Sequence, residues 1–318
     1  MPLIQKDVSL REYSSFKIGG NAEYFLQVKS KEDLTDGLRE WKALSSNFDD
    51  QGKRTFVLGG GTNLLISDSG FPGLVIHVDI KMIDVSGNII KIGAGNLVAD
   101  LLNACVNNSL SGLEWAGGLP GSIGGAVRGN AGAFGGETKD NVLEVESLDI
   151  NTLETKVRKN ADCRFAYRDS IFKSGEGKNE VITSVSFELQ PGNREEIKKI
   201  IEEKVNYRKT KHPLELPNAG SIFKNVDVES VSTLTVSEFE GHIKQDPFPV
   251  IPTAKVLIKA DLKGVKVGGA QVSEQHPNFI VNVDNARSSD VKDLIELEKE
   301  VVKQKLGIDL EVEVMFVE

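Results

Sequence analysis

Cysteine and histidine are scarce in this sequence, which argues against a metal centre or a disulfide-stabilised domain. The 318 residues include two cysteines and four histidines, and neither type occurs at the spacing of metal ligands. We therefore expect no metal site. Cys105 lies in an apolar helical pattern and Cys163 stands beside Arg164 in a strand-like run, so buried structural thiols are expected.

A long apolar run is also absent. No segment approaches the length that a membrane span requires, and the first residues lack a basic start followed by an apolar stretch. We expect a monomeric cytosolic protein with no membrane partner. Positive charge is in deficit, with a net charge of −9, which argues against non-specific nucleic-acid binding. The basic cluster 207–212 leaves an anionic small ligand open, although the same cluster also suits the carboxyl end of a helix.

The common nucleotide-binding fingerprints are missing too. No pair of glycines at Gly-x-Gly spacing is followed by the third glycine of a dinucleotide fold, because the positions that it would occupy hold Leu64, Val98 and Glu180. The segment from Gly124 to Gly129 has phosphate-loop spacing, but Asn130 stands where that loop needs a lysine. A Rossmann dehydrogenase and a P-loop enzyme are both disfavoured.

Glycine is concentrated in one place. Residues 117–136 contain nine of the chain's 31 glycines, and a second cluster at 59–61 follows the apolar run 56–58. Such density costs backbone entropy, and it suits main chain that passes close to a phosphate or diphosphate and directs N–H groups at it. Hinges, tight turns and linkers are the alternatives. Apolar residues at regular intervals make 117–136 unlike a linker.

Hydrophobic periodicity predicts an α+β protein of three parts, with boundaries at 1–80, 81–210 and 211–318. We expect helices at 31–44 behind Ser30 as N-cap, about 97–109, about 192–209, 254–260, and 289–306 behind Ser288 or Ser289. The expected strands are 23–28, 56–58, 74–78, 82–85, 89–93, 142–150, 155–157, 164–170, 181–189, 265–272, 278–283 and 310–317. Residues 227–252 are predicted to be loop-rich.

Six motifs in order along the chain resemble the UDP-N-acetylenolpyruvoylglucosamine reductases of bacterial cell-wall synthesis. They lie at 16–21, 58–63, 112–127, 167–170, 220–225 and 268–273. The short interval from Arg168 to Ser221 is similar to the second subclass of the family, which lacks an extra tyrosine-bearing loop. Val226, in place of a frequent proline, and the long segment 227–252 depart from the family pattern, as does the carboxyl end, which lacks the usual Arg and Gly.

The resemblance implies a two-part FAD-binding module of the vanillyl-alcohol-oxidase type, followed by an α+β substrate domain, with the last strand assigned to either. It also implies a reaction in which NADPH reduces FAD and the flavin passes hydride to the enolpyruvyl double bond. The product is UDP-N-acetylmuramate. The glycine clusters would then hold the FAD diphosphate, through Gly59, Gly60, Gly61, Thr62, Asn63, Gly118, Pro120, Gly121, Ser122, Gly124, Gly125, Ala126, Gly132 and Ala133.

The chemistry of that reaction gives roles to three matched residues. Hydride addition leaves negative charge that spreads into a carboxylate, which Arg168 and a protonated Glu313 would stabilise. Ser221 would protonate the carbanion. An ion pair, a turn serine and a solvent-facing strand residue are the structural alternatives, and Glu311 remains an alternative to Glu313. The resemblance also implies substrate contacts from Tyr167, Lys211, Asn225, Lys263 and His276, and charge alone adds Arg208.

Two other functions compete with this interpretation. One is a flavin oxidase or dehydrogenase of the wider fold that acts on an alcohol or sugar. The other is a sugar-nucleotide-binding regulator that has lost turnover, although the presence of Arg168, Ser221 and a candidate acid argues against it.

Overall fold

The computed structural model describes residues 3–50, 52–246 and 248–318, and the chain divides into two compact units. Unit 1 takes the chain up to Val8, then Ala22–Gly60 and Pro72–Arg208; unit 2 takes Ser9–Asn21, Gly61–Phe71 and Lys209–Glu318. Each unit has a buried hydrophobic core of its own. The three-part division at residues 80 and 210 stays a prediction, since it splits unit 1 more finely.

Unit 1 contains two main sheets. One has the strand order β1-β2-β5-β3, and its members are β1 (Ile4–Ser9), β2 (Asn21–Val28), β5 (Phe71–Val78) and β3 (Thr55–Leu58). The other has the order β12-β11-β13-β7-β6, with β12 (Thr155–Lys159), β11 (Val142–Asp149), β13 (Glu180–Glu188), β7 (Ile89–Gly93) and β6 (Ile83–Ser86). Two short ladders complete the unit, β8 (Leu110–Ser111) with β14 (Gln190–Pro191) and β9 (Gly132–Ala133) with β10 (Gly136–Glu137).

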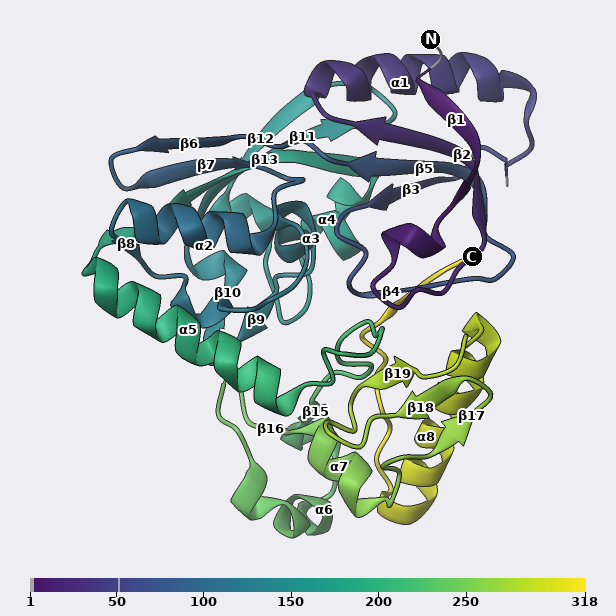
Figure 1. The fold of residues 1–318 in the computed structure, drawn as a ribbon, viewed down its shortest axis with the longest axis vertical. Coiled ribbons are helices and arrows are strands. Elements are labelled where there is room, and N and C mark those ends of the chain that lie inside the picture. The colour runs from purple at the N-terminus through teal and green to yellow at the C-terminus, as the bar shows by residue number, and fades with distance from the viewer. Residues whose placement is uncertain (1–2, 51, 247) are drawn as a thin grey trace. The chain divides into compact units, whose positions relative to one another are not determined.

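Helix α1 (Lys31–Leu44) covers one face of the first sheet (Figure 1). The Ser30 hydroxyl accepts the Asp33 N–H at 3.0 Å, and the Asp33 carboxylate accepts the Ser30 N–H at 3.1 Å. This reciprocal cap satisfies two N–H groups that a helix start leaves without partners. The predicted bounds and N-cap of this helix are confirmed, and its buried side chains are those at helical spacing, namely Leu34, Leu38 and Trp41.

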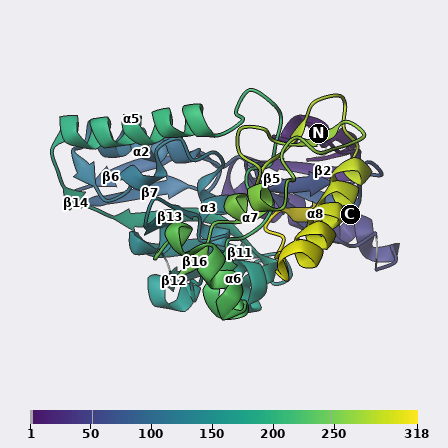
Figure 2. The same ribbon diagram turned by 90° about the horizontal axis from the view of Figure 1, so that it is seen from below.

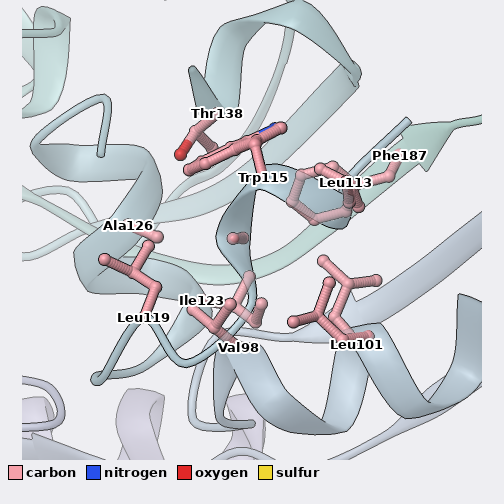
Figure 3. A pocket seen from close by; sticks show the side chains of 11 residues that line it. Val98, Leu101, Leu113, Trp115, Leu119, Ile123, Ala126, Thr138 and Phe187 are labelled. Carbon is pink, nitrogen blue, oxygen red and sulfur yellow. The ribbon is translucent and has the colours of Figure 1, made fainter. Parts of the chain in front are cut away.

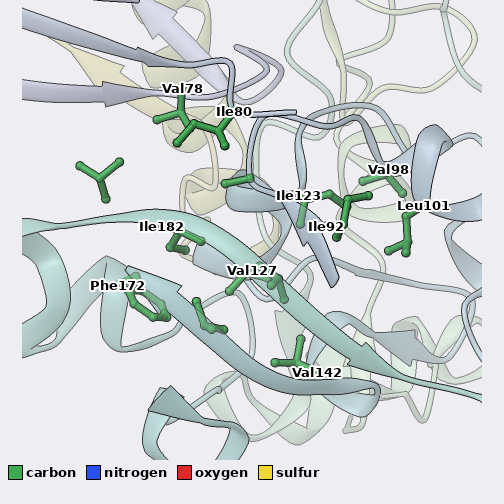
Figure 4. Packing of buried hydrophobic residues seen from close by; sticks show 14 of the residues in the cluster. Val78, Ile80, Ile92, Val98, Leu101, Ile123, Val127, Val142, Phe172 and Ile182 are labelled. Atoms are coloured by element: carbon green, nitrogen blue, oxygen red, sulfur yellow. The ribbon is translucent and has the colours of Figure 1, made fainter. Parts of the chain in front are cut away.

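The remaining helices of unit 1 are α2 (Val98–Asn107), α3 (Ile123–Arg128), α4 (Ile171–Ser174) and α5 (Arg194–Lys211), whose last three residues belong to unit 2. Helix α5 runs beside α2 (Figures 1 and 2). Side chains of α2 and α3 meet those of β7 in the core, where Ile92, Val98, Leu101 and Ile123 converge (Figure 4). Both cysteines are buried thiols, as predicted.

One helix of unit 1 was not predicted, and one predicted strand is wrong. Helix α3 lies inside the glycine stretch, where glycine's low helix propensity hid it. Residues 164–170 do not form a strand. Arg164 ends a 3₁₀ turn with a left-handed φ of 46°, and a tight turn between Ala166 and Asp169 follows, in which each N–H donates to the other residue's carbonyl. Apolar and polar residues alternate in 164–170 because one side of this turn packs against the core.

Unit 2 is built from short elements. Its sheet β17-β18-β19 joins β17 (Lys266–Val267), β18 (Ala270–Val272) and β19 (Ile280–Asn282), and two-stranded ladders pair β15 (Val226–Asp227) with β16 (Val250–Ile251) and β4 (Leu64–Ile66) with β20 (Met315–Val317). Its helices are α6 (Thr233–Glu238), α7 (Thr253–Lys259) and α8 (Ser288–Leu306). The predicted strand 265–272 is a hairpin, because Gly268 adopts φ +52° between its two arms.

The segment predicted to be loop-rich contains more regular structure than expected, and the last strand is shorter than expected. The described residues of this segment, 227–246 and 248–252, form mostly loops and turns, but they contain α6 and include most of the β15–β16 ladder. The terminal strand is limited to β20, which pairs in parallel with β4. Residues 4–9 and 64–66 form strands that the sequence patterns did not reveal.

Helix α8 packs against β17 and β18 (Figure 1). Neither Ser288 nor Ser289 is its N-cap. Arg287 holds that position, and its N–H donates to the Asp290 carboxylate at 3.0 Å. The Ser288 hydroxyl instead donates to the Asp68 carboxylate at 2.8 Å. No helix in the described part of the chain is both long and apolar enough to cross a bilayer.

Glu298 of α8 is completely buried in the core of unit 2. Among the residues that the structure describes, neither of its carboxyl oxygens has a hydrogen-bond partner. Burial raises the pKa of this carboxyl well above its ordinary value of 4.5. The side chain is therefore held neutral in the folded state at a pH where the unfolded chain ionises it.

Replacing Glu298 with Met should stabilise the protein by about 1–3 kcal/mol at neutral pH, because an unsatisfied polar group is exchanged for a methionine of similar length. The raised pKa makes stability fall with rising pH, by about 1.4 kcal/mol per unit, above the ordinary pKa and until the folded carboxyl itself ionises. Urea unfolding at several pH values measures both effects. The stability of Glu298→Gln should no longer depend on pH through this residue, while most of the cost of burying an unsatisfied polar group should remain. If both variants kept the wild-type slope of stability against pH, the assignment to Glu298 would be contradicted.

Candidate functional site

The two glycine clusters meet in unit 1. Strand β3 ends at Leu58, and the Gly60 N–H that follows donates to the Ser122 hydroxyl at 3.1 Å. A Cβ on Gly60 would lie 2.9 Å from both the Gly121 Cα and the Ser122 nitrogen, and one on Gly59 would lie 2.5 Å from the Ser122 hydroxyl oxygen. Main chain therefore packs directly on main chain here, which requires glycine.

Some N–H groups of this cradle are already used. Ile123 donates to Asn96 and Gly124 to Ala94, each at 2.9 Å, and Gly125 donates to the Ser122 hydroxyl at 3.4 Å. Within the described ranges, the N–H groups of Gly121 and Ser122 donate no hydrogen bond. Two consecutive unpaired donors between close-packed glycines suit an anionic oxygen.

The other predicted cofactor residues of unit 1 lie in different local settings. Gly118 has a φ of +72° and lies against the Arg208 side chain, whereas Pro120 is exposed. Gly132 and Ala133 form strand β9. The Ala126 side chain faces a small apolar pocket of about 20 Å³, which Leu119, Ile123 and Trp115 also line (Figure 3).

Arg168 occupies a strained turn of unit 1. It stands third in the four-residue turn 166–169 with a φ of +57°, a position that normally takes Gly or Asn. The buried Asn130 side chain donates to the Ala166 carbonyl at 2.9 Å, and the Lys173 ammonium donates to the Arg168 carbonyl at 2.6 Å. The turn is thus fixed from both sides, and Tyr167 stacks against the Arg168 guanidinium, 5.7 Å from its ring centre.

Arg208 brings a second guanidinium to the same unit. It is 7% exposed, and its Nε–H donates to the Gly117 carbonyl at 3.0 Å. Its Nη2 is buried and has no hydrogen-bond partner within the described part of the chain. Burial lowers the pKa of Arg208, and the positive charge of Arg168 lowers it further. Two guanidiniums that repel each other mark a place where an anion would be stabilising.

Ser221 lies in unit 2 on a segment that one buried amide fixes. The Asn278 side chain accepts the Phe223 N–H at 3.0 Å and donates to the Phe223 carbonyl at 2.9 Å. Its backbone carbonyl also accepts the Ile222 N–H at 2.8 Å. On the other side of the serine, Gly220 adopts φ +78° and donates its N–H to the Asn218 side chain. The half-buried Ser221 is therefore held between two anchored residues.

The segment around Ser221 also distinguishes the two candidate acids, Glu311 and Glu313. Phe223 pairs with Val312 in an antiparallel bridge, the Glu313 N–H donates to the Ile222 carbonyl at 2.7 Å, and the Lys224 N–H donates to the Glu311 carbonyl at 2.9 Å. Glu311 forms an ion pair with Lys224 at 2.5 Å. Glu313 thus lies opposite the residue next to Ser221, which favours it over Glu311.

Gly61, Thr62 and Asn63 belong to unit 2, with Ser221 and Glu313. The Asn63 side chain donates to the Glu313 carbonyl at 3.2 Å, and its own carbonyl accepts the Met315 N–H at 3.0 Å. The Ser15 hydroxyl bridges the Gly61 and Asn218 carbonyls at 3.3 and 2.7 Å. Unit 2 therefore gathers this loop, the serine and the acid into one cluster.

The predicted substrate residues of unit 2 fall into two groups. His276 is half-buried, and its ring packs on those of His212 and Phe279, with centres 5.2 and 4.9 Å away. The neighbouring Gln275 side chain donates to the Thr210 carbonyl. Lys211, which follows Thr210, is exposed. Burial lowers the pKa of His276, and Lys244 adds to this effect. Asn225 instead accepts the Thr253 N–H at the start of α7, at 3.3 Å, and Lys263 is exposed.

Several residues that build these clusters were not predicted. Most of them act through contacts with residues distant in sequence, whereas the Asn218 side chain accepts the Gly220 N–H two residues away. These residues are Ser15, Asn130, Asn218, Lys244 and Asn278. The serine and the asparagines carry one weak sequence signal, because Ser and Asn side chains often hydrogen-bond the main chain. Lys244 carries none. The described residues contain no group of three or more potential metal ligands.

Comparison with known proteins gives consistent matches over the whole chain. A model of the FAD binding domain matches residues 23–152, and a model of the UDP-N-acetylenolpyruvoylglucosamine reductase C-terminal domain matches 212–317. The chain is 36% identical over 309 residues to UDP-N-acetylenolpyruvoylglucosamine reductase of Caldanaerobacter subterraneus subsp. tengcongensis, covering 97% of this chain and 91% of the relative. It is 35% identical to the reductase of Lactobacillus acidophilus, over 99% of this chain and 95% of the relative.

A solved structure is similar throughout. The crystal structure of UDP-N-acetylenolpyruvylglucosamine reductase from Thermus caldophilus matches with a TM-score of 0.76 at 29% identity, covering 99% of this chain and all of the other. The predicted α+β fold, a flavin module of the vanillyl-alcohol-oxidase type followed by a substrate domain, is confirmed.

Proposed function

We propose, on the premise that this chain belongs to the UDP-N-acetylenolpyruvoylglucosamine reductase family of FAD-dependent oxidoreductases, that it uses NADPH to convert UDP-N-acetylenolpyruvoylglucosamine into UDP-N-acetylmuramate for peptidoglycan synthesis. The single observation that carries the proposal is the cluster of Ser221, Glu313 and the Gly61–Asn63 loop in unit 2. The flavin, when bound, carries hydride from NADPH to the substrate.

The glycine cradle of unit 1 fits the diphosphate of FAD. A side chain at Gly59 or Gly60 would fill the space between the two loops, and the N–H groups of Gly121 and Ser122 are available as donors. We assign Gly59, Gly60, Gly118, Gly121 and Ser122 to the cofactor from unit 1. Gly61, Thr62 and Asn63, which lie in unit 2, stay predicted cofactor residues. The remaining predicted residues, Pro120, Gly124, Gly125, Ala126, Gly132 and Ala133, would shape the cradle of unit 1.

Arg168 and Arg208 would bind the negative charge of the substrate. Hydride addition to a double bond conjugated with a carboxylate delocalises charge into that carboxylate, and a fixed guanidinium stabilises it without reorganisation. The strained turn at Arg168 and the buried position of Arg208 both limit movement. Tyr167 would orient the Arg168 guanidinium from its ring face.

Ser221 and Glu313 would complete the reaction. The anchored Ser221 hydroxyl is a suitable proton donor to a carbanion, because the strong basicity of the carbanion offsets the weak acidity of an alcohol. Glu313 would donate a hydrogen bond to the substrate carboxylate in its protonated form. The group around His276 with Lys211 would contact the nucleotide, joined by Asn225 and Lys263.

The direct test follows the colour of the purified protein. It should be yellow, bleach when NADPH is added, and regain colour when UDP-N-acetylenolpyruvoylglucosamine follows without oxygen. Recovery of colour only with oxygen and an alcohol or sugar would favour a flavin oxidase. A folded protein that stays colourless with added FAD, or whose flavin NADPH does not reduce, would refute the proposal.

Gly60→Ala should weaken FAD binding at least tenfold and destabilise unit 1 by about 1–3 kcal/mol. The new Cβ would lie 2.9 Å from main-chain atoms of Gly121 and Ser122, which cannot rotate away as a side chain can. FAD titration of the apoprotein and thermal unfolding measure the two effects. Gly129→Ala is the matched control, because its Cβ would meet only Gly125 oxygen at an ordinary 3.6 Å; equal losses in both variants would count against the cradle.

A further inference from the structure

The hairpin of β9 and β10 carries a phenylalanine where its turn normally takes Asn, Asp or Gly. Phe134 and Gly135 join the two strands with φ values of +53° and +83°. Positive φ at both central residues defines the type I′ turn, and a bulky residue at the first position is strained. The Phe134 side chain is 42% exposed, so burial in a core does not account for its presence.

The neighbours of the Phe134 ring are cationic. The Lys204 ammonium lies 4.7 Å from the ring centre and the Arg208 guanidinium carbon 5.2 Å. The Tyr207 ring meets Phe134 edge to face, with centres 5.3 Å apart. Residues 204, 207 and 208 share one face of α5 by helical spacing, so the hairpin tip covers the cationic face of that helix.

The Arg208 side chain has neighbours on three sides, and on the fourth its Nη2 has no acceptor among the described residues. Its Nε–H donates to the Gly117 carbonyl, and its Cδ lies 3.0 Å from where a Cβ of Gly118 would be. The Phe134 ring supplies the third side. The remaining amino group, Nη2, is buried and has no acceptor among the residues described. A guanidinium fixed in this way presents one directed donor to an anionic oxygen.

We propose that Phe134 is a positioning residue that holds the Arg208 guanidinium in place for an anionic group of the sugar nucleotide. The inference rests on the proposed function, which supplies that ligand. A cation over an aromatic face is attracted by the ring quadrupole, and the attraction grows when water is excluded. Asn, which would relieve the turn, has no such ring, and this explains why the strained residue is the one present.

Phe134→Asn separates turn geometry from ring chemistry. The variant should keep or raise the melting temperature, since Asn suits the left-handed conformation. Its dissociation constant for UDP-N-acetylmuramate should rise about 5–10-fold through loss of the cation–π contact. Binding is measured by calorimetry on the flavin-loaded protein. Phe134→Tyr should restore wild-type affinity, whereas Phe134→Leu, which keeps apolar bulk without the quadrupole, should not.

UDP-N-acetylglucosamine distinguishes two sources of the anion. It has the diphosphate and lacks the carboxylate, so equal weakening for both nucleotides identifies the diphosphate, and weakening for UDP-N-acetylmuramate alone identifies the carboxylate. Unchanged affinity in Phe134→Asn, full rescue by Leu, or a lowered melting temperature in Phe134→Asn would overturn the role of Phe134. A wild-type protein that binds neither nucleotide would instead overturn the proposed function.

Discussion

Ser221→Ala should slow the reoxidation of the flavin by substrate by about 10²–10⁴-fold, while reduction by NADPH proceeds at close to the wild-type rate. The reason is that only the second half-reaction needs a proton at carbon. The segment around Ser221 is anchored by Asn278 and Asn218 through main-chain and side-chain hydrogen bonds that do not involve the hydroxyl. Removal of that oxygen should leave the fold and the position of Glu313 unchanged.

Stopped-flow absorbance measures the two half-reactions separately. Ser230→Ala serves as the control, because it removes a hydroxyl of unit 2 that bonds only the Asp227 carbonyl at the surface. Ser221→Cys, which retains a proton on the side chain, should recover part of the lost rate. If Ser221→Ala slowed both half-reactions equally, the serine would have a structural role and another group would deliver the proton.

Arg168→Gly should lower kcat/KM by about 10²–10³-fold and leave the free energy of unfolding equal to or higher than that of the wild type. Loss of one preorganised charge that stabilises the transition state has an effect of this size. Glycine relieves the left-handed φ of +57° that Arg168 adopts. The two effects therefore have opposite signs, and a loss of activity cannot be attributed to unfolding.

Arg164→Gly is the matched control for this experiment. Arg164 is also an arginine with a left-handed φ, of 46°, four residues earlier, and it is exposed. Its replacement should stabilise to a similar extent with kcat/KM within about twofold of the wild type. Steady-state kinetics and urea unfolding on both variants provide the comparison. Equal activity losses would show that the loop, rather than the Arg168 charge, matters.

The sequence predicted the elements whose signals are local. Helix α1 has apolar residues at helical spacing behind a capping serine, so its bounds could be read directly. Short strands and turns gave weaker signals. At 164–170, for example, a turn that packs against the core produces the same alternation of apolar and polar residues as a strand. Helix α3 was missed for a related reason, since glycine-rich segments form helices only where tertiary hydrogen bonds hold them.

The candidate site was predictable in its residue types and less so in its register. The motif around Ser221 and the acidic strand near residue 313 were identifiable, yet the choice between Glu311 and Glu313 depends on which one lies opposite Ile222. The Ile222 side of that pairing is held by Asn278, which lies 55 residues from Phe223 and about 35 from Glu313 in the sequence. Asn278 belongs to neither local pattern. Likewise, nothing adjacent to Phe134 in sequence shows that Arg208 lies beside its ring.

The pairing of Asn63 with Glu313, 250 residues apart, bears on how the protein is made. The ribosome releases the Gly61–Asn63 loop and β4 long before it synthesises the segment that pairs with them. Closing so long a loop is entropically slow. During translation β4 is therefore unpaired, and its exposed edge can form non-native pairings. A nascent chain stalled before residue 311 would accordingly lack both the acid and the strand that seals unit 2.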